Sequence, residues 1–577
     1  MAAESTGEAP EVNDVQPWRG DERGVRSADG RRAWDEVADV VVVGFGAAGG
    51  SAALHAHGSG AHVVVADRFR GGGATARSAG VVYFGGGTPL QRDAGYDDTP
   101  ENMYRYLQLE VRDAVDDATL RAFCERSVET FAWLVELGVP FPSSGQALKT
   151  SYPPDDCTLY FSGNELCPPY RDAADPAPRG HRALGKGLTG HLIFAALRRR
   201  AAALGLDVRS CTRAERLVVG EGGEVLGVEL VELADATWVR WAHRLTELAI
   251  TYGGGFSRPL ATALRERLLR FEARHVRRRR LVRARGGVVL AAGGFVFNPA
   301  LMDRWAPRYA ASSLRLGTAG DDGHGIRLGE AVGAKLDHLD RCCAWRFINP
   351  PSAWTRGVLV GPDGGRICNE ELYGSTIGEH MAERTGGRGV LVLDRDAMAL
   401  SRRQLRTEKM GGFQIVFGLA NDYLNYVKAG SLEALAQRAG LPAEALVRTV
   451  EAYNEAARAG HDPLGKSEAA LHPLRTPPFY AIDCDFGTVR FPTPCLTLGG
   501  LAVDGLSARV LRADGGEPIG GLYAAGRNAV GISSSSYVSG LSVSDGLFSG
   551  RNAGLHAAAR ARSREAGTRP RVAERVA

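Results

Sequence analysis

Strand-like and helix-like patterns alternate near both ends of the chain, and a different pattern lies between them. Near the start, the apolar run Asp39–Val43 leads into the glycine-rich turn Gly44–Gly49. Small residues follow as far as His57, and a second apolar run covers Ala61–Asp67. Short apolar runs bounded by glycine are typical of buried parallel strands, and the segment between them has the length of a helix. The pattern therefore predicts a β-α-β unit.

Further segments extend this predicted domain. Short alternating stretches at Asp207–Cys211, Arg216–Val219 and Val225–Val231 predict a small meander of strands. The apolar run Val288–Gly294 predicts another buried strand that ends in glycines. A similar pattern returns at residues 479–558. We therefore expect an α/β fold, in which residues 37–324 and 479–558 form one Rossmann-like domain.

The other segments predict what surrounds that domain. Residues 325–478 lack the glycine and strand pattern and contain helical stretches such as Ser431–Ala459, which predicts an inserted α+β substrate cap domain. Residues 1–36 are polar and predict a disordered arm, and residues 559–577 predict a polar tail.

A helical insertion is predicted at residues 234–283. Leucines from Leu260 to Leu268 repeat at helical spacing, and Arg277–Arg280 forms a basic run. Two interpretations remain open. The insertion is either a surface hairpin with a solvated charged face, or a contact with a membrane surface or another subunit.

Composition narrows the function classes. A chain of 577 residues with 44% hydrophobic and 24% charged residues is typical of a globular protein with two domains. The net charge of +4 gives no sign of a nucleic-acid partner. The nine cysteines lack the paired spacing of a metal site or a disulfide framework, so we expect no metal. No apolar run approaches the roughly 18 residues of a membrane span, and no signal region is visible, so we expect a cytoplasmic protein.

The first glycine turn has the chemistry of a dinucleotide site. Its three glycines allow a tight turn, close approach of the backbone to a pyrophosphate, and packing of helix on strand. The helix that follows presents unpaired N–H groups to phosphates. Asp67 ends the second strand, where a carboxylate can accept hydrogen bonds from a ribose. Gly71–Gly80 adds small and hydroxylated residues against which a flat ring can lie. A glycine turn used only for packing is the alternative.

With both ends taken together, the chain resembles the flavoprotein family of fumarate reductases and 3-ketosteroid dehydrogenases from about Asp39 to Ala558. The motifs that carry the resemblance are Gly44–Gly49, Gly71–Gly80, Leu290–Phe295, Gly320–Ile326, Arg366–Tyr373 and Gly521–Gly526. The resemblance implies that residues 37–324 and 479–558 form a Rossmann-like FAD-binding domain of the glutathione-reductase type. It also implies FAD, held without a covalent bond because Gly71–Gly80 contains no histidine. The implied cofactor-binding residues are Gly44, Gly46, Ala47, Ala48, Gly49, Asp67, Arg68, Ala74, Thr75, Ser78, Ala79, Gly80, Ala214, Ala292, Gly293, Asp322, Gly526, Arg527, Ser542 and Val543.

Two positions separate the branches of this family. In fumarate-type members an arginine that donates a proton follows the Asn-Glu motif, here Asn369–Glu370, whereas this chain has Gly374 at about that place. Those members also carry a His-Gly-x-Asn-Arg clamp, whereas this chain has Ser533–Ser536 and then Tyr537-Val-Ser539-Gly540. A site that carries hydroxyls where the fumarate-type members carry cations suits a neutral substrate with a ketone. Tyr373 and the Tyr-x-Ser-Gly segment resemble the 3-ketosteroid Δ4-(5α)-dehydrogenase branch.

This resemblance implies a dehydrogenase that introduces a carbon-carbon double bond α,β to the ketone of a steroid-like substrate. FAD takes a hydride, and Tyr373, Tyr537, Ser539 and Gly540 bind the carbonyl or relay the proton. Which of these hydroxyls accepts the proton stays open. Tyr373 could instead be a buried cap residue with no catalytic role, and Ser533–Ser536 could be a loop without a role in the chemistry. The expected partners are a small-molecule ketone and an unidentified electron acceptor. A reductase of an activated double bond and a non-catalytic binding protein are the alternative functions.

Overall fold

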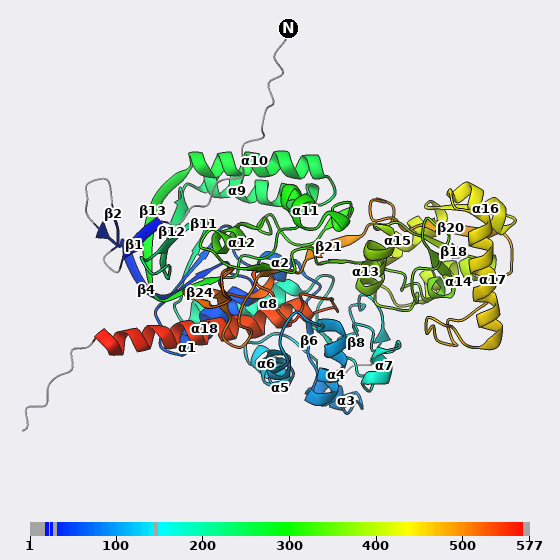
Figure 1. Cartoon of the computed structure of the whole chain (residues 1–577), viewed down its shortest axis with the longest axis horizontal. Helices are drawn as coiled ribbons and strands as arrows, with labels where there is room; N and C mark the ends of the chain where they lie inside the picture. Colours follow the sequence, from blue (N-terminus) through cyan, green and yellow to red (C-terminus); the bar gives the residue numbers. More distant parts are fainter. Residues whose placement is uncertain (1–17, 22–23, 27–31, 143–147, 569–577) are drawn as a thin grey trace, which may run out of the picture.

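A mixed sheet of eleven strands organises the larger lobe of the molecule (Figure 1). The computed structural model describes residues 18–21, 24–26, 32–142 and 148–568. At the centre, β4 (Glu36–Val43) pairs in parallel with β5 (Val63–Asp67) on one side and β13 (Val276–Leu290) on the other. The sheet continues through β10 (Asp207–Ser210), β11 (Thr212–Val219), β12 (Val225–Leu233), β23 (Arg509–Leu511) and β24 (Pro518–Ala524). Because both faces of the central strands are covered, their sequences are continuous apolar runs.

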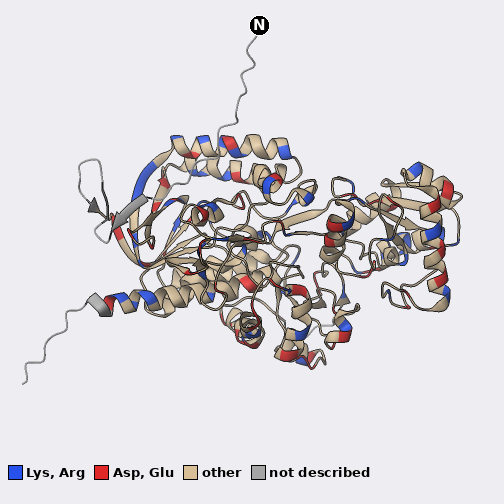
Figure 2. Cartoon of the chain, viewed as in Figure 1, with Lys and Arg blue, Asp and Glu red and all other residues tan. Residues whose placement is uncertain are grey.

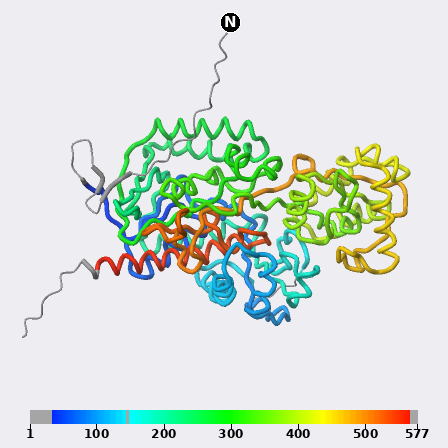
Figure 3. Tube along the Cα trace, in the orientation of Figure 1, coloured from blue at the N-terminus to red at the C-terminus, as the bar shows by residue number. Residues whose placement is uncertain are grey.

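The first and last helices of the described residues lie side by side in this lobe (Figure 3). Helix α1 (Ala47–Gly58) connects β4 to β5, as the β-α-β pattern predicts. Helix α18 (Leu541–Thr568) packs against it through Gly550 and Gly554. A Cβ atom at either glycine would lie 2.2 Å from a carbonyl oxygen of α1, so larger residues would force the helices apart. This contact joins the two halves of the predicted cofactor domain.

Regular structure extends further toward both ends than the sequence predicted. Strands β1 (Trp18–Asp21), β2 (Gly24–Arg26) and β3 (Arg32–Ala33) continue the sheet beyond β11, so these residues are not a disordered arm. Backbone pairing with an edge strand needs no apolar sequence pattern, which is why composition missed it. The tail predicted at 559–577 is helical as far as Thr568. The remainder of both predicted segments lies outside the described residues.

The predicted insertion is a helical hairpin that is shorter than expected. It consists of α9 (Thr237–Leu248), the π-helical turn η1 (Ala249–Gly253) and α10 (Arg258–Arg274). The expected end at residue 283 is wrong, because Val276 begins β13 and pairs with β12. Arg279 and Arg280 of the basic run bind Glu229 and Glu232 of the neighbouring strand. The basic run therefore belongs to the sheet.

The smaller lobe is the cap (Figure 1). Its sheet has the order β17 (Val358–Val360), β18 (Val390–Leu393), β20 (Phe479–Asp483) and β19 (Tyr426–Ala429). Strand β20 was predicted to open the second part of the cofactor domain, but it lies in the middle of the cap sheet. A short apolar run does not show which sheet it joins. The cap helices are α13 (Gly374–Thr385), α14 (Arg395–Thr407), α15 (Gly412–Tyr423), α16 (Leu432–Ala439) and α17 (Ala443–Ala459).

Two smaller sheets complete the surroundings of the site. One has the order β6 (Val81–Tyr83), β9 (Gly180–Arg182), β8 (Leu159–Phe161) and β7 (Leu148–Lys149). The other lies where the two lobes join and pairs β21 (Pro494–Thr497) with β14 (Leu314–Arg315) and β16 (Cys342–Ala344). Further helices of the larger lobe are α2 (Gly73–Arg77), α4 (Pro100–Val111), α5 (Asp117–Glu125), α6 (Ser127–Glu136), α8 (Gly190–Ala203), α11 (Pro299–Trp305) and α12 (His324–Glu330).

Candidate active site

A cavity of about 920 Å³ brings the predicted site residues together. Every predicted cofactor-binding and catalytic residue lines it except Gly49 and Gly80. Those two have packing roles. A Cβ atom would lie 1.9 Å from the carbonyl oxygen of Gly44 at the first position and 2.1 Å from Oγ1 of Thr189 at the second. The cavity thus joins residues from both ends of the chain to residues of the cap.

The first glycine turn opens onto this cavity in the manner of an anion site. Gly44 has a φ angle of +98°, and a Cβ atom there would lie 2.4 Å from the carbonyl oxygen of Ala291. Gly46 is the N-cap of α1 and has no side chain to cap the helix. Ala47 donates its N–H to Oγ1 of Thr75 at 3.0 Å. This side chain therefore occupies the N–H of Ala47, while the positive dipole end of α1 faces the cavity, which Gly46, Ala47 and Ala48 line.

Asp67 lies on the cavity wall, but its carboxylate already accepts three backbone hydrogen bonds. The donors are the N–H groups of Phe45 at 2.9 Å, Phe69 at 2.8 Å and Gly71 at 3.0 Å. The carboxylate therefore ties the first glycine turn to the second. Spacing alone could not distinguish this bracing role from the expected ribose contact.

Arg68 binds the helical hairpin to the wall of the cavity. It donates to Asp322 and to Glu272 of α10, each at 2.8 Å, and Glu272 also contacts His243 of α9 at 2.9 Å. Burial works to raise the pKa of Glu272, but Arg68 and His243 hold that pKa well below its usual range. The hairpin contributes cavity residues that the sequence interpretation missed: Glu247, Thr251, Tyr252 and Phe256.

Arg527 gives a direct test of whether FAD fits. One of its terminal nitrogens donates to Asp321 at 2.5 Å, while the other, Nη1, is buried without a partner among the described residues. Arg527 lines the cavity together with the small residues Ala74, Ser78 and Ala79. A buried guanidinium nitrogen requires an acceptor, and small side chains leave room for a flat ring. These features, with the open start of α1, fit a flavin dinucleotide.

Tyr373 and Tyr537 are brought together by Trp345, a residue that the sequence interpretation missed. The indole Nε1 of Trp345 donates to the hydroxyl of Tyr373 at 2.9 Å. The same indole packs edge-on against the ring of Tyr537, with the ring centroids 4.9 Å apart. All three side chains are buried and line the cavity. Ser539 and Gly540 line it as well. Trp345 follows β16 and belongs to no motif, so only tertiary structure reveals it.

The surroundings of these hydroxyls keep them protonated. Burial raises the pKa of Tyr537 well above its usual value. Burial and the neighbouring Tyr160 and Tyr537 do the same for Tyr373. Tyr160, a buried residue of β8, is a second neighbour that no sequence pattern indicated. Neutral tyrosine hydroxyls in a dry site are hydrogen-bond donors.

Gly374 has a steric reason to be glycine. It is the first residue of α13, directly after Tyr373, and a Cβ atom there would lie 2.9 Å from the carbonyl oxygen of Arg346. An arginine of the fumarate type would not fit at this position without a shift of the backbone.

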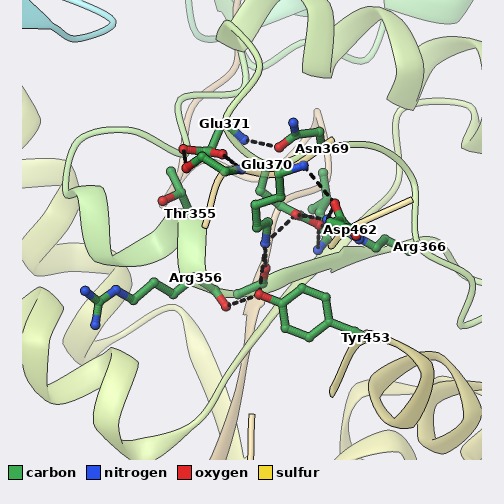
Figure 4. Close-up of polar contacts among 12 residues, drawn as sticks. Thr355, Arg356, Arg366, Asn369, Glu370, Glu371, Tyr453 and Asp462 are labelled. Atoms are coloured by element: carbon green, nitrogen blue, oxygen red, sulfur yellow. Dashed lines mark hydrogen bonds and ion pairs between the residues drawn. The ribbon is translucent and has the colours of Figure 1, made fainter. Parts of the chain in front are cut away.

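The Asn-Glu motif belongs to a buried ion-pair network in the cap (Figure 4). Glu370 contacts Lys466 and Arg366, each at 2.7 Å, and Arg366 also contacts Asp462 at 2.6 Å. Burial works to raise the pKa of Glu370, but the two cations lower it overall. None of these four side chains lines the cavity. We define them as the cap lock, because they join segments of the cap that are far apart in sequence.

Behind Tyr373, a buried hydrogen-bonded chain holds the start of α13. Oδ1 of Asn164 accepts from the N–H of Tyr373 at 2.7 Å, and its Nδ2 donates to Glu110 of α4 at 2.8 Å. The hydroxyl of Tyr106 also donates to Glu110 at 2.8 Å. Burial raises the pKa of Glu110 to about 7. A charged carboxylate at this position therefore destabilises the folded protein above neutral pH.

The variant Glu110→Gln is expected to be more stable than the wild type at pH 8. Because the pKa in the folded state lies above its usual value, the wild type loses stability as pH rises from about 4.5 to 7, by up to about 3 kcal/mol. The amide keeps an acceptor for Asn164 and has no charge, so the variant loses less over this interval. Urea unfolding at pH 5 and pH 8 measures the difference. Glu125→Gln, an exposed change, is the control, and equal pH slopes for Glu110→Gln and the wild type would contradict the prediction.

The described residues contain neither a metal site nor a helix able to span a membrane. Across the described residues, no group of three or more His, Cys, Asp or Glu side chains could hold a metal ion. Within the same residues, no helix combines the length and the apolar character needed to cross a bilayer.

Comparisons with known proteins agree with this geometry. The FAD binding domain family model matches residues 39–543. The 3-oxo-5-alpha-steroid 4-dehydrogenase of Comamonas testosteroni is 38% identical over 85% of this chain and 93% of its own length. The 3-ketosteroid-delta4-(5alpha)-dehydrogenase of Rhodococcus jostii, solved in complex with 4-androstene-3,17-dione, is 34% identical with a TM-score of 0.75 and covers 93% of this chain and 99% of its own.

A more distant structure shares the fold alone. The 3-ketosteroid delta1-dehydrogenase of Sterolibacterium denitrificans is 20% identical with a TM-score of 0.60, and the match covers 91% of this chain and all of the other.

Proposed function

The chain belongs to the FAD-binding-domain family of flavoproteins and is an FAD-dependent oxidoreductase acting on CH–CH groups, and we propose that it dehydrogenates a ketosteroid. In this proposal a carbon-carbon double bond forms α,β to the ketone of a steroid-like substrate. The observation that carries it is the group of Tyr373, Tyr537 and Trp345 in a buried, mainly aromatic and aliphatic part of the cavity.

The residues of the chain perform the proton half of the reaction. A proton next to a ketone is lost readily only when donors stabilise the developing enolate oxygen. The hydroxyl of Tyr537 and the N–H of Gly540 are the proposed donors, and Trp345 holds the hydroxyl of Tyr373 in place. Ser539 and Tyr373 are the proposed path for the proton. FAD, held by the residues that line the cavity around the start of α1 and Arg527, would supply the hydride acceptor for the adjacent carbon.

The shape of the cavity supports a fused-ring ketone. Beyond the hydroxyls, its wall includes Phe347 and Leu496 from the junction between the lobes and Phe413 and Phe417 from α15 of the cap. Sites that bind apolar ligands combine such walls with a few polar groups that set orientation. The relatives named above act on, or were solved with, ketosteroids according to their names.

The alternative reactions receive less support. A fumarate-type reductase needs cations beside the substrate, whereas the position that carries its arginine is the crowded Gly374. A binding protein without cofactor would leave Nη1 of Arg527 buried without a partner. An enone reductase uses the same groups in the reverse direction, and the electron acceptor decides between the two. The glutathione-reductase-type topology, a cytoplasmic location and contact with a membrane surface are further parts of the proposal.

Anaerobic mixing of the purified protein with a saturated 3-keto-5α-steroid tests the function. The flavin absorbance is expected to bleach within seconds and to recover when an artificial electron acceptor is added. A spectrum that stays oxidised with this ketone, while an enone reoxidises chemically reduced protein, would favour the reductase instead. The flavin is expected to leave the protein on denaturation, because we propose that it is held without a covalent bond.

A further inference from the structure

Helix α9 of the hairpin has its apolar side outward. Trp241 and Trp238 are 63% and 59% exposed, and Leu245 on the same side is 44% exposed. The inner side of the helix carries Val239, His243 and Glu247, which are buried. The large apolar side chains thus face outward while two ionisable side chains face inward, unlike a helix that covers a core in water.

Ion pairs explain how the helix keeps this orientation. On the inner side, His243 contacts Glu272 of α10 at 2.9 Å, and Glu247 pairs with Arg77 of α2 at 3.8 Å. Glu272 is also bound by Arg68 of the larger lobe. Rotating α9 to bury its tryptophans would break these pairs and leave charges without partners. The outward apolar side is therefore built into the structure.

The apolar side of α9 continues to the rim of the cavity. Tyr252 and Phe256, at the turn of the hairpin, are 65% and 55% exposed and also line the cavity. Across the opening, Phe413 of α15 lines the cavity, and Val416, one turn along the same helix, is 61% exposed. We call the five residues Trp238, Trp241, Leu245, Tyr252 and Phe256 the tryptophan face.

Positive charge accompanies this face. Between Thr237 and Arg274, seven arginines stand against three glutamates, and arginines follow both hairpin helices in Figure 2. Arg240, Arg244 and Arg258 pair with neighbouring acidic side chains. The charge available to headgroups therefore comes mainly from exposed residues such as Arg267 and Arg274 of α10. Exposed tryptophan and tyrosine beside arginine are typical of helices that lie in the headgroup region of a bilayer. The apolar side chains enter the boundary of the acyl chains, while the arginines attract anionic headgroups.

We infer that the tryptophan face docks on the surface of a lipid bilayer that contains anionic headgroups, with the rim of the cavity turned toward the membrane. The basic run Arg277–Arg280, the sequence feature first associated with a membrane, is engaged in the sheet instead. Docking in this orientation lets an apolar substrate pass from the bilayer into the cavity, and this last step rests on the proposed function.

Co-sedimentation of the FAD-loaded protein with vesicles tests the docking without any substrate. We expect the wild type to pellet with vesicles of phosphatidylcholine and phosphatidylglycerol, and much less with phosphatidylcholine alone. Trp241→Ser and the double variant Trp238→Ser/Trp241→Ser are expected to weaken binding at least about tenfold. Neither tryptophan lines the cavity, so flavin content and flavin reduction by the ketone stay unchanged. The single variant is included because Trp238 also packs against His275.

Val135→Ser is the matched control, since Val135 is 47% exposed on α6, on the opposite side of the larger lobe (Figure 1). No pelleting of the wild type with anionic vesicles, or equal pelleting of the double variant, would overturn the inference. The wild type could instead self-associate in solution and not bind vesicles. If the double variant abolished that self-association, the tryptophan face would be assigned to contact with a second copy of the chain. Because binding is measured without steroid, these outcomes are independent of the test of function.

Discussion

Replacing Tyr537 with phenylalanine is expected to slow flavin reduction by the steroid about 10² to 10³-fold, the usual loss on removing one donor to a developing oxyanion. The ring that packs against Trp345 is kept, so the shape of the cavity changes little. Burial keeps the native hydroxyl protonated, so it is a donor that phenylalanine lacks. Stopped-flow absorbance at saturating ketone measures the rate, and the flavin spectrum reports that the cofactor is retained.

Tyr480→Phe is the control for loss of a tyrosine hydroxyl. Tyr480 is buried in β20 of the cap sheet and does not line the cavity, so its variant is expected to keep the wild-type rate. A rate for Tyr537→Phe within about threefold of the wild type would remove Tyr537 from the chemistry. The carbonyl would then depend on Tyr373 and Gly540.

The variant Glu370→Gln is expected to lose about 3 kcal/mol or more of folding free energy, because it leaves the buried Lys466 and Arg366 of the cap lock without their shared carboxylate. The amide of glutamine is close to the carboxylate in size, so the loss of folding free energy is caused by the missing charge and not by a change in side-chain volume. Urea unfolding followed by tryptophan fluorescence measures the change. Trp354 is buried in the cap and supplies a signal there.

Glu451→Gln, an exposed change on α17 of the cap, is the control and is expected to have little effect on stability. Adding Lys466→Met to Glu370→Gln is expected to recover part of the loss, because it removes one of the charges left without a partner. If Glu370→Gln unfolds at the same urea concentration as the wild type, the cap lock contributes no net stability.

Local pattern predicted those parts of the site that depend on backbone shape. The glycine turn at Gly44 and the strand before it form as expected, because a tight turn beside a buried strand restricts which residues can occupy it. The Tyr-x-Ser-Gly segment also lies on the cavity wall. These features are encoded within a few neighbouring residues.

Other features depend on partners far away in sequence. The strand β20 was predicted in the cofactor domain but joins the cap sheet. The carboxylate of Asp67 lines the cavity as predicted and also accepts from three backbone N–H groups, which no pattern indicated. Ser533 and Ser534 are buried and donate to Asp545 and to the carbonyl of Leu498. Charge and hydropathy along the chain do not reveal which segment supplies the partner.

The sequence by itself thus determined the cofactor class and the glycine turn between two parallel strands, since both depend on short motifs whose backbone requirements are local. It also predicted that Tyr373 and Tyr537 belong to one site, and both line the cavity. Tertiary structure alone decided that Trp345 holds Tyr373 beside Tyr537, and that a basic hairpin closes over Arg68. It also decided that α9 faces outward with its tryptophans. The physical reason is that buried hydrogen bonds and ion pairs join residues hundreds of positions apart, and their energies depend on geometry that exists only in the folded chain.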